Sequence, residues 1–112
     1  MENLVRAVVV YDGRLLLVRE TEDWELPSGT GQPAETAKAA AARVVYELTG
    51  YLADGSATLD GASAVVCQLL SEGPSEGARL APARVRWTPI EETVSITLPP
   101  AVRDYIGGHT PV

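Results

Sequence analysis

The stretch Trp24–Tyr51 limits most strongly what this chain can fold into, because glycine and proline residues mark both of its ends. Residues Trp24–Pro27 are predicted to form a short extended piece that the proline closes, and Ser28–Gly31 a tight glycine-containing loop. A helix is predicted over Ala34–Leu48, because apolar residues recur on one stripe of an alanine-rich run, and Gly50 is predicted to cap its C-terminus. The stretch therefore predicts an extended segment, a loop and one amphipathic helix, in that order.

Two strongly β-prone runs precede this stretch, Leu4–Val10 and Leu15–Val18. The pair Asp12-Gly13 between them favours the positive dihedral angles of a tight hairpin turn, so the runs are predicted to pair. Their hydrophobicity is continuous rather than alternating, which indicates strands that are buried on both faces. A sheet with helices on both sides is therefore expected.

The rest of the chain adds shorter elements. Ala62–Leu70 and Arg84–Trp87 are predicted strands, and Ser71–Gly77 is a flexible loop punctuated by proline and glycine. Thr88 is predicted to cap a helix, with proline in the first turn and Glu91 reaching back to the cap. The two prolines at 99 and 100 open a last predicted helix that runs through Ile106.

Composition excludes several classes of protein. The 112 residues carry a net charge of −6, which argues against a partner that is a nucleic-acid polymer, because such a surface must neutralise phosphates. No run of about 18 apolar residues and no signal-peptide pattern is present, so no membrane association and a cytoplasmic location are expected. Cys67 is the only cysteine and is predicted to be a buried core thiol. His109 is predicted to be an exposed terminal residue.

The central stretch resembles the Nudix box, the signature of the Nudix hydrolase family. The matching positions follow the first by six, fourteen, eighteen and twenty-one residues, with an apolar residue next: Gly29, Glu35, Arg43, Glu47, Gly50 and Tyr51. The resemblance implies that residues 1–112 form a single Nudix-like domain with an α/β (α+β) fold, a mixed β-sheet sandwiched between helices with a loop-helix-loop box. It also implies hydrolysis of nucleoside diphosphate derivatives with Mg²⁺ or Mn²⁺.

The carboxylates that this chemistry uses are mostly replaced. In the family, three glutamates on one helix face bind divalent cations, because positions i, i+3 and i+4 are neighbours on a helix. Here those positions are Val44, Glu47 and Leu48, and a rotation of about 100° per residue places the two aliphatic ones in or beside the buried stripe. Glu47, with Gly29 and Glu35, is left to form a metal site that is weak or absent.

The candidate catalytic residues are Glu47 and Arg43. The family also uses the glutamate that follows the arginine as a ligand or general base, and this chain has Val44 there. If the two replacements together remove about 4 kcal/mol of transition-state stabilisation, the rate falls on the order of a thousandfold. The sequence leaves open whether any hydrolysis remains.

Other candidate site residues lie outside the helix. The predicted ligand contacts are Arg19, which can reach a phosphate from its polar loop, Trp24 and Gly29. A loop in the second half of the chain often adds another acid to the site in the family, and Glu72 and Glu76 are the candidates here.

Three hypotheses follow. The first is a Nudix-fold protein with impaired catalysis that serves as a binding or regulatory module for a nucleotide-like small molecule or a protein partner. The second is a divergent metal-dependent hydrolase in which Glu47, Glu35 and a loop acid rebuild the metal site. The third is a structural or oligomerising domain, for example a homodimer, in which another subunit covers the apolar face at Val44 and Leu48.

Overall fold

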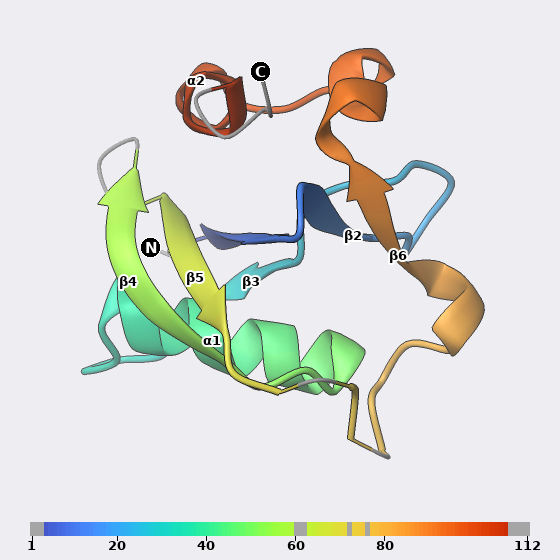
Figure 1. Ribbon diagram of the computed structural model, residues 1–112. Helices are drawn as coiled ribbons and strands as arrows, with labels where there is room; N and C mark the ends of the chain where they lie inside the picture. The colour runs from blue at the N-terminus through green and yellow to red at the C-terminus, as the bar shows by residue number, and fades with distance from the viewer. Residues whose placement is uncertain (1–3, 60–62, 72, 76, 108–112) are drawn as a thin grey trace.

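The computed structural model describes residues 4–59, 63–71, 73–75 and 77–107, and shows a mixed sheet between helices (Figure 1). Its elements are β1 (Leu4–Tyr11), β2 (Arg14–Val18), β3 (Ser28–Thr30), α1 (Ala37–Thr49), β4 (Ala53–Leu59), β5 (Ala64–Leu69), η2 (Pro82–Arg84), β6 (Val85–Pro89), η3 (Ile90–Ser95) and α2 (Pro100–Gly107). The predicted α/β (α+β) class, with a mixed sheet and a loop-helix-loop, is confirmed. No helix within these residues is long and apolar enough to span a membrane.

The sheet runs in the order β4-β5-β1-β2-β6, and β3 pairs with β1 beside this path. The β1–β5 pair is parallel, whereas β1–β2, β1–β3, β2–β6 and β4–β5 are antiparallel. The predicted hairpin between β1 and β2 is confirmed, because Asp12 and Gly13 have φ angles of 53° and 72°. Figure 1 shows α1 on one side of the sheet and α2 on the other.

The continuous apolar strands are buried on both faces, as predicted. Val5, Ala7 and Val9 of β1 pack with the α1 residues Ala40, Ala41 and Val45. Val8 of β1 and Leu15 and Leu17 of β2 pack instead with Val102 and Ile106 of α2. We call these two sides the α1 face and the α2 face. Alternate residues of one strand therefore belong to two different cores.

The helix of the box begins later than predicted. Ala34 has a φ angle of 66°, which is incompatible with a helical residue, and α1 starts only at Ala37. Thr36 is its N-cap, because the Thr36 hydroxyl accepts a hydrogen bond from the backbone N–H of Ala39 at 3.1 Å. The C-terminal prediction is confirmed, since Gly50 caps the helix in the left-handed conformation with φ at 81°. A side chain at Gly50 would also collide with the carbonyl oxygen of Ser75.

The predicted loop Ser28–Gly31 is wrong for its first three residues. Ser28–Thr30 forms β3, which pairs with β1 through Arg6↔Ser28, Val5↔Gly29 and Leu4↔Thr30. The strand forms because the backbone of this segment pairs with β1, which is distant in the sequence. Gly29 allows the strand to lie against α1, since a Cβ atom there would be 2.7 Å from Cγ2 of Val44.

The predicted cap at Thr88 is also wrong. Thr88 belongs to β6, opposite Leu15 of β2, and its buried hydroxyl accepts a hydrogen bond from Nε of Arg86 at 3.0 Å. The helix that follows is the 3-10 helix η3, which starts after Pro89 without a side-chain cap. Pairing with β2 thus places Thr88 in a strand, although the local sequence pattern predicts it to be a helix cap.

Two smaller predictions concern Cys67 and the last helix. Cys67 lies in the α1-face core at 3% exposure, and burial raises the pKa of its thiol to about 11, as expected for a core cysteine. The last helix extends through Ile106 as predicted and includes Gly107. His109 and Ala62 lie outside the described residues.

Candidate functional site

One arginine holds the loop of the box against its helix. Nε and Nη2 of Arg43 donate to the two carboxylate oxygens of Glu35 at 2.9 and 3.1 Å. Nη2 also donates to the backbone carbonyl of Thr30 at 2.9 Å, which links the helix to the end of β3. Glu35 in turn accepts a hydrogen bond from the backbone N–H of Gln32 at 3.0 Å. These bonds close the non-helical segment between β3 and α1 and explain why the helix starts late.

The electrostatics of this pair follow from its geometry. The hydrogen bonds from Arg43 hold the pKa of Glu35 below its usual value, with a further contribution from the Gln32 N–H. The same pairing with Glu35 raises the pKa of Arg43. Both side chains are only partly exposed, at 25% for Arg43 and 15% for Glu35. The pair is therefore fixed in its charged form near neutral pH.

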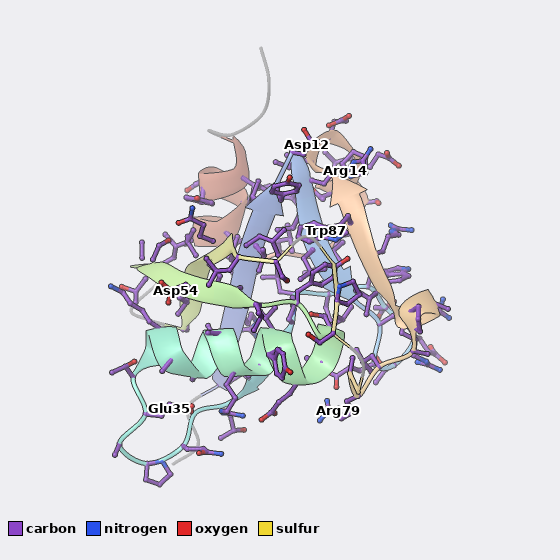
Figure 2. All side chains as sticks on the ribbon, turned by 60° about the horizontal axis from the view of Figure 1, so that its bottom comes forward. Asp12, Arg14, Glu35, Asp54, Arg79 and Trp87 are labelled. Atoms are coloured by element: carbon purple, nitrogen blue, oxygen red, sulfur yellow. The ribbon has the colours of Figure 1, made fainter. Side chains whose placement is uncertain are left out.

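Glu47 lies on the other side of the same guanidinium. Nη1 of Arg43 donates to both of its carboxylate oxygens, at 3.3 and 3.2 Å, and the side chain is 53% exposed. The structure thus brings together the three predicted residues Glu35, Arg43 and Glu47. Figure 2 shows Glu35 in the loop at the N-terminal end of α1.

The two aliphatic replacements are buried, as the helical rotation predicts. Val44 and Leu48 are 3% and 2% exposed. They form a small apolar cluster with Val18 of β2, against which Leu80 and Val85 pack. The face that carries carboxylates in the family is here the inside of a core.

Leu80 belongs to a chain segment that is fastened to α1. The backbone N–H groups of Arg79 and Leu80 donate to the carbonyls of Glu47 and Leu48 at 2.8 and 3.2 Å. The Arg79 side chain forms an ion pair with Glu20, and Figure 2 shows it near the C-terminal end of the helix. We call residues 77–81 the strap. The strap therefore satisfies two carbonyls of the last turn of α1 and covers apolar side chains.

The side chains at the expected metal-binding positions do not fit a divalent metal ion. Mg²⁺ and Mn²⁺ prefer several oxygen ligands, but the carboxylates of Glu35 and Glu47 are both occupied by Arg43 and two ligand positions are hydrocarbon. Gly29 lies in the β1–β3 ladder. Within the described residues, no three His, Cys, Asp or Glu side chains form a group able to hold a metal. Glu72 and Glu76 lie outside the described residues.

A cavity of about 900 Å³ opens on the α2 face of the sheet. Trp24 and Leu26 line it from the extended piece before β3, and the segment 95–100 closes it from the side of α2. Two arginines also line it, Arg6 of β1 and Arg86 of β6. The guanidinium carbon of Arg86 lies 4.7 Å from the centre of the Trp24 ring, a cation–π contact.

The predicted ligand contacts are thus distributed over different places. Trp24 lines the cavity, whereas Gly29 is in β3 and Arg19 is exposed outside the cavity lining. Sequence reasoning did not single out Arg6 and Arg86. The sequence does contain a pattern that marks them, because each arginine stands between two apolar residues in a predicted strand, V-R-A and V-R-W. Leu80 was also missed, and no periodicity marked it.

A mixed sheet between helices, with a loop and helix clamped by one arginine and closed by a left-handed glycine, defines a Nudix-type scaffold. The sequence matches the NUDIX domain over residues 1–106. The chain therefore belongs to the NUDIX domain family.

Solved structures show the same fold. A NUDIX hydrolase from Nitrosomonas europaea is 24% identical, with a TM-score of 0.70 over 97% of this chain and 91% of the other. An ADP-ribose pyrophosphatase from Streptococcus suis is 20% identical, with a TM-score of 0.63 over 95% and 84%. A MutT NUDIX hydrolase from Burkholderia pseudomallei is 26% identical, with a TM-score of 0.55 over 93% and 94%. No curated protein matches this chain.

Proposed function

We propose that this protein is a Nudix-fold module that binds a nucleotide-like ligand, or regulates through such binding, without efficient hydrolysis. The observation that carries the proposal is the burial of Val44 and Leu48 under Leu80. A diphosphate needs metal ions to neutralise the charge that develops during its cleavage. At the face where the family places those ions, this chain has an apolar core with a hydrogen-bonded strap over it.

The remaining box residues have structural work that is independent of catalysis. Arg43 donates to Glu35, Glu47 and the Thr30 carbonyl, so a substrate phosphate would have to compete with these partners. This arrangement supports the loss of chemistry with retention of the scaffold. The α2-face cavity supports the retention of binding, because its size is typical of small-molecule sites and Trp24 offers an aromatic surface. A nucleotide-like ligand also accords with the pyrophosphatase and UDP-X diphosphatase among the structural neighbours.

The other two hypotheses have less support. A divergent hydrolase would need Glu47 and Glu35 to turn from Arg43 towards a metal ion. An oligomerising role through the face at Val44 and Leu48 is unnecessary, because Leu80 and Val85 of the same chain pack on that face. A homodimer would therefore use a different surface. The cytoplasm is the compartment that we propose for this binding role.

The test is a panel of nucleosides, nucleotides and nucleoside diphosphate derivatives incubated with Mg²⁺ or Mn²⁺ and measured for both binding and product. The expected result is binding without turnover, weakened by Trp24→Ala and unchanged by Trp87→Phe, whose ring lies on the other face against Tyr51. Metal-dependent turnover that disappears in Glu47→Gln but persists in the matched exposed variant Glu91→Gln would refute the proposal and establish the hydrolase.

A further inference from the structure

We infer that the α2-face cavity selects ligands with a single terminal phosphate, nucleoside monophosphates, which it holds between the guanidinium groups of Arg6 and Arg86. The inference rests on the proposed binding function and adds which chemical class binds. It starts from an unusual position for an arginine. Arg6 is the third residue of β1 and lies between Val5 and Ala7, which are both buried on the α1 face, so its side chain projects to the α2 face.

The Arg6 side chain is half-buried in the cavity wall and has no hydrogen bond or ion pair with any described residue. A guanidinium carries five N–H donors and always bears a charge, so partial burial without an acceptor is unfavourable. An anionic ligand would remove that cost. Phosphate is well suited, because guanidinium groups bind it through two parallel hydrogen bonds.

Arg86 offers a second guanidinium to the same cavity. Its neighbours Val85 and Trp87 pack on the α1 face, so Arg86 also projects to the α2 face. Nε is held by the Thr88 hydroxyl at 3.0 Å and the group lies over the Trp24 ring, while its terminal nitrogens have no acceptor among the described residues. The arginine is thus fixed at its base and open at its donor end.

The extended piece before β3 separates the two arginines. This piece is inserted where β1 and β2 diverge, because Pro27 accepts from the N–H of Ala7 at 2.8 Å and Glu25 accepts from the N–H of Val18 at 2.8 Å. Arg6 belongs to the strand on one side of it and Arg86 to the strand beyond β2 on the other. Trp24 lies between, which places an aromatic surface next to two cationic groups.

The charges around the cavity limit the length of the phosphate chain. Three exposed carboxylates also line it, those of Glu22, Asp23 and Glu25. Two guanidinium groups balance one dianionic phosphate, whereas the added negative charge of further phosphates would be repelled by these acids in a protein of net charge −6. The helix site cannot take the excess charge, since it lies on the other face of the sheet and is filled by Leu80. The same acids can accept hydrogen bonds from base or sugar donors.

Isothermal titration with AMP, adenosine, ADP-ribose and inorganic phosphate tests this inference, with the guanine and cytosine series run in parallel. The expected result is that a monophosphate binds at least tenfold more tightly than its nucleoside and than its diphosphate derivative. Arg6→Gln and Arg86→Gln should each weaken monophosphate binding about tenfold and leave nucleoside binding unchanged. Arg14→Gln is the matched control, because Arg14 is exposed outside the cavity lining. Melting curves establish that each variant is folded, and Arg86→Lys provides a second, milder change.

The outcomes separate the two proposals. If nucleosides or diphosphate derivatives bind as tightly as monophosphates or more tightly, or if neither arginine variant weakens monophosphate binding, the inference is overturned while the binding function stands. If inorganic phosphate binds as tightly as AMP, the site recognises the free anion and the nucleoside part of the inference fails. Binding of no probe at all overturns the inference together with the proposed ligand-binding function.

Discussion

Replacing Leu48 by Glu tests whether the former carboxylate face is a sealed apolar core. Leu48 is 2% exposed and lies among Val18, Val44 and Leu80, so an introduced carboxyl has no charge partner in that cluster. Its pKa should rise to neutrality or beyond. Protonation at pH 7 of a group with an unfolded pKa of about 4.3 costs about 3.7 kcal/mol at about 1.36 kcal/mol per unit. Loss of the buried leucine adds about 2 kcal/mol, giving about 5 to 6 kcal/mol in total.

Urea unfolding of the unmodified protein, Leu48→Gln and Leu48→Glu measures this cost. The carboxyl pKa is raised in the folded state, so the penalty is present above the unfolded pKa and diminishes as the pH falls. The part specific to Glu should therefore drop from about 3.7 kcal/mol at pH 7 to about 1 kcal/mol at pH 5. If Leu48→Glu and Leu48→Gln are equally stable at pH 7, the carboxylate reaches water or a partner, and the idea of a sealed face is refuted.

Adding Val44→Glu to this variant extends the test to the metal. The pair would rebuild the i, i+3, i+4 arrangement with Glu47. A metal that binds only the folded state stabilises it by about 2.7 kcal/mol at a hundredfold excess over Kd. If the family geometry persists beneath Leu80, Mg²⁺ should raise the melting temperature of the Glu pair and not that of the matched Gln pair. An equal response would show that the strap has remodelled the site beyond two side chains.

Three further predictions follow from single contacts. Gly29→Ala should destabilise the protein by about 1 to 3 kcal/mol through its clash with Val44, and Val44→Ala in the same chain should recover part of the loss in urea unfolding; strictly additive effects would contradict the contact. Cys67, with a pKa of about 11, should resist a thiol reagent at pH 8 until urea is added, so rapid labelling of the native protein would count against burial. Arg43 lowers the pKa of Glu35 in the folded state, so the stabilisation by this pair should be complete above the usual glutamate pKa and lost as the pH falls through the lowered value. In Glu35→Gln, the melting temperature should no longer show this acid-dependent loss. A pH dependence that is the same in both proteins would argue against the pair.

The fold was predictable where local pattern and burial agree. The continuous apolar runs gave β1 and β2, Asp12-Gly13 gave their turn, and Gly50 gave the end of α1. The errors fall where distant residues override local preference. Alanine and proline before Thr36 suit a helix start, but the bonds from Arg43 to Glu35 and Thr30 hold that segment in another conformation. No local pattern carries that information.

The candidate site shows the same division. The burial of Val44 and Leu48 followed from helical rotation alone, because the direction of a side chain is set by its position in the helix. The side chain that covers them did not, since Leu80 lies in an irregular segment whose place depends on hydrogen bonds to α1. The pairing of Arg6 and Arg86 in one cavity also depends on sheet order, which places their strands on either side of β2.

The retained box residues explain how the scaffold can exist without the carboxylates. Arg43 ties β3 and the loop to α1, Gly29 allows β3 to approach Val44, and Gly50 allows the chain to pass Ser75. Each of these contacts is made between groups of the protein itself. A glutamate at 44 or 48 is different, because in this core it is unfavourable unless a cation compensates its charge. Aliphatic residues need no compensating cation and allow Leu80 to pack on them. A glutamate introduced at either position alone would therefore lie in a filled apolar core rather than in an open metal site. Recovery of a metal site therefore requires changes at 44 and 48 together, and the Mg²⁺ response of the double variant decides whether the strap must change as well.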